Sequence, residues 1–184
     1  MHHDELWQLF RQNGEPMIGA SWESALGNPG ADVDEIVGVA ITFLYRRREN
    51  GGVEFLWQKR ADDIDRYPGY YDLSAGGHIN LGESAVEAAI REAREEIGAR
   101  LDADDLMYGF MRPFNKNRFA WLYFVDYTDM SNEFHFDDNE VSEVKWVLYD
   151  EMRDFVHNYA KPPLAKDEMT FDFVDEWLKM HGII

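Results

Sequence analysis

The sequence lacks cysteine and lacks any long apolar run. Without cysteine there can be no disulfide bond, no thiolate nucleophile and no zinc site with cysteine ligands. The absence also fits a reducing compartment, so we expect a cytoplasmic protein. The longest nearly apolar run, Ile36 to Tyr45, has about half the roughly 20 residues of a membrane span. The amino terminus has no signal-peptide pattern, and we expect no membrane association.

Basic residues are also scarce, since 18 lysines and arginines face 36 aspartates and glutamates and the formal net charge is -18. Such a charge repels phosphate backbones, so we do not expect a nucleic-acid polymer as partner. A small anionic substrate would need a metal ion or clustered basic side chains. The sequence is 45% hydrophobic and 15% aromatic, which is enough for a packed core. The length of 184 residues fits one domain spanning 1–184.

Apolar and β-branched segments between turn residues predict an α+β fold. Strands are expected at residues 35–45, 53–60, 71–75, 106–114, 119–127 and 141–149, with an amino-terminal hairpin from 5–10 and 17–20. Asp150 is expected to cap a helix that ends near Tyr159, and a final amphipathic helix to begin at Asp167 or Thr170. One central helix separates the strands. This order predicts a mixed sheet sandwiched by helices, α/β/α in layers.

The central helix lies in the segment Gly77 to Ala99, GHINLGESAVEAAIREAREEIGA. Glu92, Glu95 and Glu96 lie at positions i, i+3 and i+4, so they share one face of the helix. Like charges at this spacing repel, and a divalent cation with oxygen ligands would relieve the repulsion. The opposite face should be buried; the residues expected there are Val86, Ala89, Ile90, Ala93 and Ile97.

Four further features in and beside this segment can be predicted. Alanines 85 and 88 are expected to leave room beside the glutamates, Arg91 to pair with Glu87 and Glu95, and Gly98 to end the helix in a left-handed conformation. Gly76 and Gly77 are expected to let the backbone turn sharply and approach a ligand.

The spacing resembles the Nudix box, G-x5-E-x7-R-E-U-x-E-E-x-G-U, where U is a bulky aliphatic residue. The fixed positions are filled by Gly77, Glu83, Arg91, Glu92, Glu95, Glu96 and Gly98. A chance match is on the order of 10⁻⁸ per window. The sequence departs from the pattern at Ala93 and Ala99, which stand at the aliphatic positions. These departures affect packing more than chemistry.

The resemblance implies a MutT-like Nudix hydrolase with a core at about residues 35–158 and additions at both ends. Nudix hydrolases cleave diphosphate linkages, typically in nucleoside diphosphate derivatives, and they use Mg²⁺ or Mn²⁺. Glu92, Glu95 and Glu96 would then be metal ligands, with Glu83 as a secondary ligand and the Gly77 carbonyl as a further one. Arg91 would orient the glutamates. Many relatives are dimers, so the resemblance also leaves a homodimer open.

The candidates outside the box, and His78 at a variable position inside it, each leave two roles open. Glu140, in the acidic loop before the last strand, is either a general base or a solvated acid. Lys59 and Arg60 end a strand and either contact phosphate or are ordinary strand-end charges. His78 is either in contact with substrate or simply solvated.

Two rival functions remain. The segment QKRADDIDRYPGYYDLSAGGHINLGES is similar to the isopentenyl-diphosphate isomerase-like branch of the superfamily. Those isomerases rely on a cysteine, which this sequence lacks. The other rival is a non-catalytic Nudix module that binds a nucleotide. Such modules usually lose box glutamates, and this sequence retains them.

Overall fold

The computed structural model describes residues 5–23, 36–115, 117–130, 133–137, 139–162 and 165–184. Its strands are β1 (Leu6–Phe10), β2 (Pro16–Glu23), β3 (Ile36–Arg47), β4 (Val53–Arg60), β5 (Tyr71–Asp72), β6 (Ala75–His78), β7 (Met107–Asn115), β8 (Arg118–Asp126) and β9 (Val141–Leu148). Its helices are α1 (Ala85–Ile97), α2 (Met152–Tyr159) and α3 (Glu168–Met180), with 3-10 turns η2 (Ala103–Asp105) and η3 (Tyr149–Glu151). The expected hairpin at the amino-terminal end is present as β1 and β2.

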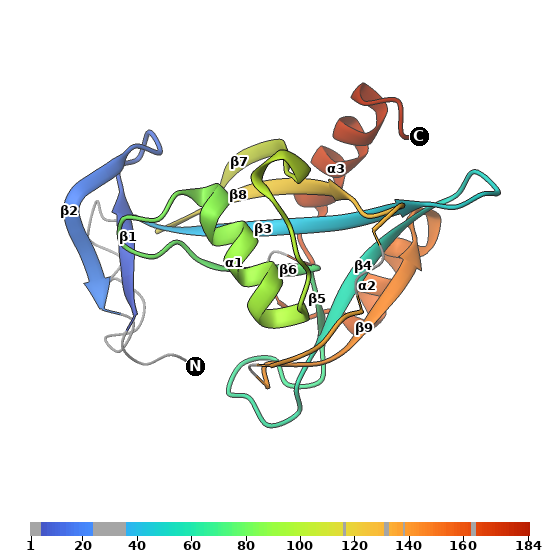
Figure 1. Cartoon of the computed structure of the whole chain (residues 1–184), viewed down its shortest axis with the longest axis horizontal. Helices are drawn as coiled ribbons and strands as arrows, with labels where there is room; N and C mark the ends of the chain where they lie inside the picture. Colours follow the sequence, from blue (N-terminus) through green and yellow to red (C-terminus); the bar gives the residue numbers. More distant parts are fainter. Residues whose placement is uncertain (1–4, 24–35, 116, 131–132, 138, 163–164) are drawn as a thin grey trace.

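The strands form one mixed sheet organised around β3 (Figure 1). Along one edge of β3, β8 runs parallel from residue 118 to residue 126. Along the other edge β1, β6 and β4 follow one another, all antiparallel to β3. β4 meets β3 only at residues 53–55 and then diverges to pair with β5 and β9. The sheet therefore splits beside β6, which among the described residues pairs with β3 alone.

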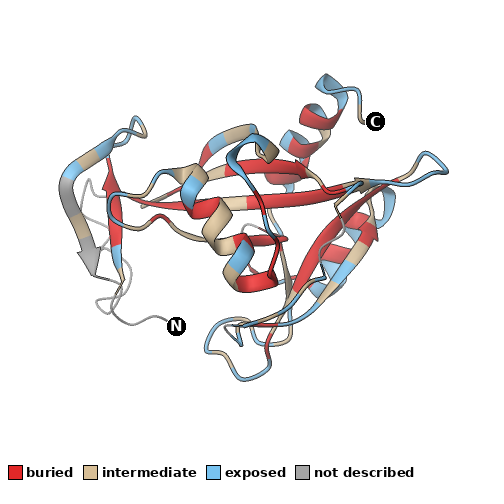
Figure 2. Ribbon diagram, viewed as in Figure 1, coloured by how far each residue is buried: buried red, intermediate tan, exposed pale blue. Residues whose placement is uncertain are grey.

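Helices cover both faces of this sheet (Figure 1). On one face Ala88 and Ala89 of α1 pack with Phe10, Ala40 and Ile79. On the other face α2 and α3 cover a larger aromatic core. In this core the rings of Trp177 and Phe124 are stacked, with their centroids 3.8 Å apart. Figure 2 shows the resulting buried band along β3, β4 and β8. The predicted α/β/α sandwich with a mixed sheet is confirmed.

Two local predictions are wrong. Gly76 and Gly77 do not turn the chain: they lie within β6, paired with Ile41 and Ala40, and neither has a positive φ. Asp150 does not cap α2, because it lies inside η3 and the preceding turn leads directly into the helix. By contrast, Asp167 caps α3 as predicted by accepting a hydrogen bond from the backbone N–H of Met169.

Of the helices in the part of the chain that the structure describes, none combines the length and the apolar content needed to cross a lipid bilayer.

Candidate active site

α1 is held at both ends by local hydrogen bonds. Ser84 and Glu87 form a reciprocal capping box at its start, and Gly98 ends it at φ 69°. The Glu87 carboxylate accepts from the Ser84 backbone N–H at 2.8 Å and makes no ion pair with Arg91, so that predicted pair is wrong. The capping bond prevails because it satisfies a backbone donor at the helix end that has no intrahelical partner.

The helix lies closer to the sheet than its polar sequence suggested. Ala88, Ala89 and Ala93 are fully buried, so Ala88 does not leave room beside the glutamates as predicted. Val86 and Ile90 are only half-buried. Ala93 and Ala99, the small residues at the aliphatic positions of the box, are both fully buried as well. Their small size lets the backbone of α1 approach β6 and β3 closely.

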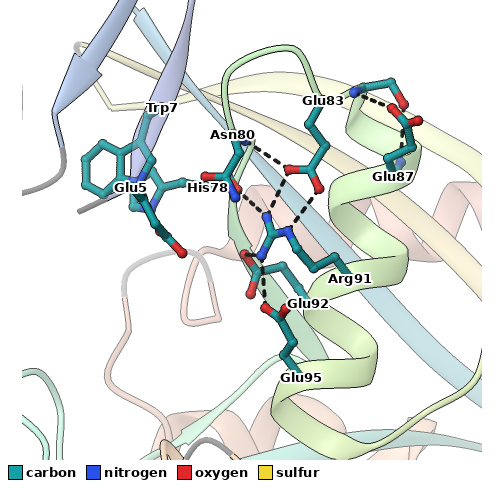
Figure 3. A network of polar contacts seen from close by, with 10 residues as sticks. Glu5, Trp7, His78, Asn80, Glu83, Glu87, Arg91, Glu92 and Glu95 are labelled. Atoms are coloured by element: carbon teal, nitrogen blue, oxygen red, sulfur yellow. Dashed lines mark hydrogen bonds and ion pairs between the residues drawn. The ribbon is translucent and has the colours of Figure 1, made fainter. Parts of the chain in front are cut away.

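Arg91 is the centre of a polar network between the end of β6 and the first turns of α1 (Figure 3). Its guanidinium donates to Glu83 at 2.9 and 3.0 Å, to Glu92 at 2.7 Å and to Glu95 at 3.2 Å. It also donates to the His78 carbonyl at 2.9 Å. One cation thus gathers three carboxylates that would otherwise repel one another. The predicted i,i+4 pair of Arg91 and Glu95 is confirmed.

Glu92 lies against the backbone of β6. A Cβ atom on Gly77 would fall 2.2 Å from Glu92 Oε1, so a larger residue at this position would displace the Glu92 carboxylate. Burial raises the pKa of Glu92 to about 7; Arg91 opposes this shift, and the charges of Glu95 and Glu5 add to it. Glu5 comes from the segment before β1 and is a carboxylate near the site that sequence reasoning missed (Figure 3).

Glu96 is separated from the other glutamates by its hydrogen bonds. Its side chain is buried, with 5% of the residue exposed, and Oε2 accepts from the Gly76 N–H at 2.8 Å and from Gln58 Nε2 at 3.1 Å. Gln58 belongs to β4, so Glu96 joins α1 to β4 across the split in the sheet. Sequence reasoning missed Gln58, because no motif links β4 to the box.

The remaining candidates lie away from the Arg91 network. Glu140 lines a cleft of about 220 Å³ with Arg60, Asp63, Ile64, Asp65 and Arg66. In this cleft Arg60 donates to the Arg66 carbonyl at 2.9 Å. Lys59 follows Gln58 in β4, so its side chain leaves the opposite face of the strand from the Gln58–Glu96 bond. The structure therefore brings Glu83, Arg91, Glu92 and Glu95 together, and it does not bring Lys59, Arg60 or Glu140 into their network. Asp138, in the same acidic loop as Glu140, lies outside the described residues.

His78 is not a solvated loop residue. Its ring stacks on Trp7 of β1 with centroids 3.6 Å apart and an interplanar angle of 8°. Burial lowers the pKa of His78 to about 3, and the positive charges of Arg118, Arg66 and Arg91 lower it further. The contact of Trp7 with His78 could not be predicted from the sequence. It forms only because β1 lies beside the loop that follows β6.

The buried neutral ring of His78 should make stability fall in acid. A lowered pKa means that the unfolded chain binds a proton below pH 6.5 while the folded chain does not, so this contribution is lost as pH falls from 6.5 towards 3. Between pH 7.5 and pH 5 it amounts to about 2 kcal/mol. His78→Phe keeps the stack on Trp7 and should remove that contribution, so urea unfolding at the two pH values should show a smaller acid loss.

His157→Phe is the control, because His157 is exposed on α2. This variant should keep the acid loss of the wild-type protein. An unchanged acid loss in His78→Phe would show that His78 is not held neutral in the fold.

Comparison with known proteins gives a consistent result. The sequence-family model of the NUDIX domain matches residues 36–167 of this chain. The chain is 35% identical over 145 residues to Nudix hydrolase 3 of Arabidopsis thaliana, a match that covers 71% of this chain but 18% of that protein. It is 31% identical over 153 residues to an uncharacterized Nudix hydrolase of Listeria innocua, covering 80% of this chain and 82% of the relative. The crystal structure of DR0079 from Deinococcus radiodurans shares the fold, with a TM-score of 0.64 and 23% identity over 88% of this chain and 96% of that one.

Proposed function

Because this chain belongs to the Nudix family, we propose that it hydrolyses a diphosphate linkage in a small molecule, with Mg²⁺ or Mn²⁺ as cofactor. The observation that supports this proposal most directly is the gathering of Glu83, Glu92 and Glu95 around the single guanidinium of Arg91. Three carboxylates around one guanidinium group give this partly buried site a net negative charge. That charge favours a divalent cation and requires one before an anionic substrate can approach.

The donor atoms fit such a cation, because every candidate ligand is an oxygen. We propose Glu92, Glu95 and Glu96 as ligands, with Glu83 and the Gly77 carbonyl in support. Among the described residues no three histidine or acidic side chains already converge at coordinating distance, since Arg91 and Gln58 hold the carboxylates. Binding therefore requires these side chains to rotate. The Glu95 side chain, 38% exposed, is the freest to do so.

A bound divalent cation would neutralise the charge that makes a diphosphate resist attack by water. We propose that the Glu92 carboxylate accepts the proton of the attacking water, because a carboxylate within hydrogen-bond reach of such a water can act as its general base. Glu140 is the alternative acceptor. Arg91 orients Glu92 and Glu95 through the hydrogen bonds described above. Lys59 and Arg60 are proposed phosphate contacts.

The proposed substrate is a nucleoside diphosphate derivative or a related small molecule. The excess of 36 acidic over 18 basic residues argues against a nucleic-acid polymer. We further propose that residues 1–184 form one domain. The amino-terminal hairpin supports this, because β1 pairs with β3 in the sheet that carries α1.

Incubation with a panel of diphosphates tests the proposed function. ADP-ribose, NADH, diadenosine tetraphosphate, UDP-glucose and isopentenyl diphosphate are each mixed with the protein and Mg²⁺ or Mn²⁺, and ³¹P NMR follows the products. We expect phosphomonoester products with metal, none with excess EDTA, and recovery when metal is restored. Tight binding without turnover would identify a non-catalytic module, and formation of dimethylallyl diphosphate would identify an isomerase.

A further inference from the structure

A polar side chain interrupts the apolar face that β4 turns toward α1. Leu56 lies on this face and is buried in a cluster with Ala93 and Ile97 of α1. Because alternate residues of a strand share a face, Gln58 follows Leu56 on the same side, where it meets Glu96. Gln58 is only 3% exposed. Burial of an amide is unfavourable unless both its donor and its acceptor find partners.

Only the nitrogen of this amide is paired. Nε2 of Gln58 donates to Glu96 Oε2 at 3.1 Å. Oε1 of Gln58 is buried and makes no hydrogen bond within the described residues. The amide cannot simply be reversed, because its oxygen would then face the Glu96 carboxylate, which accepts hydrogen bonds and does not donate them when ionised. A buried acceptor in this state is unfavourable and points to a group that completes it.

The side chains paired with Gln58 across the sheet supply no donor for Oε1. Val144 of β9 and Asp72 of β5 are the paired residues, so their side chains lie on the same face as the amide. Val144 is apolar, and an ionised aspartate only accepts hydrogen bonds. Arg60, two residues further along β4, donates from Nε to the Arg66 carbonyl at 2.9 Å, and its Nη1 lies 4.0 Å from Asp72. The surroundings of Oε1 therefore suit a ligand that brings its own hydrogen-bond donors.

We propose that Gln58 Oε1 accepts a hydrogen bond from the water shell of the divalent cation, which makes Gln58 a binding residue of the metal site from outside the box. The inference rests on the proposed function insofar as Glu96 is a metal ligand. The oxygen and nitrogen of an amide are about 2.3 Å apart, so Oε1 lies within about 5.5 Å of Glu96 Oε2. Mg²⁺ binds oxygen ligands at about 2.1 Å and keeps several waters. One such water can therefore bridge a cation at Glu96 and the Gln58 amide.

The two ends of the amide then act together on the metal site. Nε2 of Gln58 and the Gly76 N–H, the latter at 2.8 Å, both donate to Glu96 Oε2 and fix this carboxylate against β4 and β6. Hydrogen bonds to a metal ligand orient it and raise the affinity for the metal. Oε1 adds an acceptor for the water of the cation. Because Gln58 lies on β4, beyond the split in the sheet, the metal site would join β4 to β6 and α1.

Mn²⁺ binding to the full chain, without substrate, tests the role of Gln58. Electron paramagnetic resonance of free Mn²⁺ gives the dissociation constant, and competition extends the measurement to Mg²⁺. Gln58→Met keeps the length of the side chain and removes both hydrogen-bonding groups, so it should weaken Mn²⁺ binding by about tenfold or more. Gln12→Met is the matched control, because Gln12 is exposed in the turn after β1, and it should bind Mn²⁺ as the wild-type protein does.

Gln58→Glu separates the role of the oxygen from that of the nitrogen. This variant keeps an acceptor but loses the N–H group that holds Glu96. If the oxygen serves the cation, Gln58→Glu should bind Mn²⁺ at least as tightly as the wild-type protein. If Gln58 only holds Glu96 in place, both Gln58 variants should bind Mn²⁺ equally weakly, and the contact with the water shell is overturned. The same Mn²⁺ affinity in Gln58→Met and Gln12→Met would overturn it as well.

NMR of the wild-type protein gives a measurement that needs no substitution. Titration with Mg²⁺ should shift the side-chain NH₂ signals of Gln58 with the midpoint of metal binding, because a hydrogen bond to the carbonyl oxygen polarises the amide. The side-chain signals of Gln12 should stay in place. If the Gln58 signals did not move while Mg²⁺ bound, the contact would be excluded even where the Gln58 variants failed to fold.

Hydrolysis assays then separate this inference from the proposed function. Mn²⁺ binding that depends on Gln58, without hydrolysis of any diphosphate in the panel, would refute the proposed hydrolysis alone. Hydrolysis together with an unchanged metal affinity in Gln58→Met would refute the role of Gln58 alone.

Discussion

Glu95→Gln is expected to lower kcat for diphosphate hydrolysis by about 10²-fold or more, because loss of a proposed metal ligand should cost at least as much as loss of a group that only orients such a ligand. Glu95 is the most exposed carboxylate of the Arg91 network, at 38%, and one of its oxygens lies 3.2 Å from Arg91. Glutamine preserves the shape of the side chain but removes the charge that would attract the metal ion. Steady-state kinetics over a range of Mg²⁺ concentrations should show both a lower kcat and a weaker metal dependence.

The fold should tolerate this substitution. Removing one of three clustered carboxylates relieves repulsion, so the free energy of unfolding should change by less than about 1 kcal/mol. Glu176→Gln is the matched control, because Glu176 is exposed on α3 and pairs with Lys179 at 3.3 Å, outside the site. Glu95→Gln with the same kcat and metal dependence as Glu176→Gln would remove Glu95 from the proposed machinery.

Gly77→Ala is expected to lower kcat by about 10²-fold with only a small loss of stability. The added Cβ would lie 2.2 Å from Glu92 Oε1 and 2.4 Å from Glu92 Cδ. Both atoms are at the end of a flexible side chain, so the carboxylate can swing away and the backbone need not move. That movement breaks the 2.7 Å bond to Arg91 and displaces Glu92, and a displacement of about 1 Å in a catalytic group can cost about 10²-fold in rate.

Gly52→Ala is the control for this substitution. It lies in the turn between β3 and β4, where an added Cβ would meet nothing closer than 3.6 Å. Steady-state kinetics and urea unfolding of both variants separate a loss of activity from a loss of stability. If Gly77→Ala kept full activity, the position of Glu92 against β6 would not be required for catalysis. If the substitution unfolded the protein, Gly77 would be required for packing of the fold instead.

The sequence predicted the fold class because the strands between residues 36 and 60 are strongly patterned. The apolar segment at 35–45 became β3, and the segment at 53–60 became β4 with the same bounds as predicted. α1 was predicted from the box, and Gly98 ends it with positive φ as expected. These features depend on local periodicity and on local backbone preference, which a linear sequence displays directly.

The sequence was a weaker guide to how α1 meets its surroundings. Glu92, Glu95 and Glu96 share a helical face by spacing, yet Glu96 is buried against Gln58 while Glu95 stays near solvent. Ala88 was expected to face the site and is fully buried in the core. Helical periodicity gives the direction of a side chain and says nothing about how close the neighbouring strands come.

By itself, therefore, the sequence determined the family, the α+β class and the set of box residues, because all three depend on residue types at fixed spacing. Only the tertiary structure decided which side chains from distant segments lie close together. It brought Glu5 near Glu92, Trp7 onto His78, and Arg118 to the sheet face of His78. The physical reason is strand pairing: β1, β6 and β8 all meet along β3, and the register of each pair sets which side chains from distant segments point the same way.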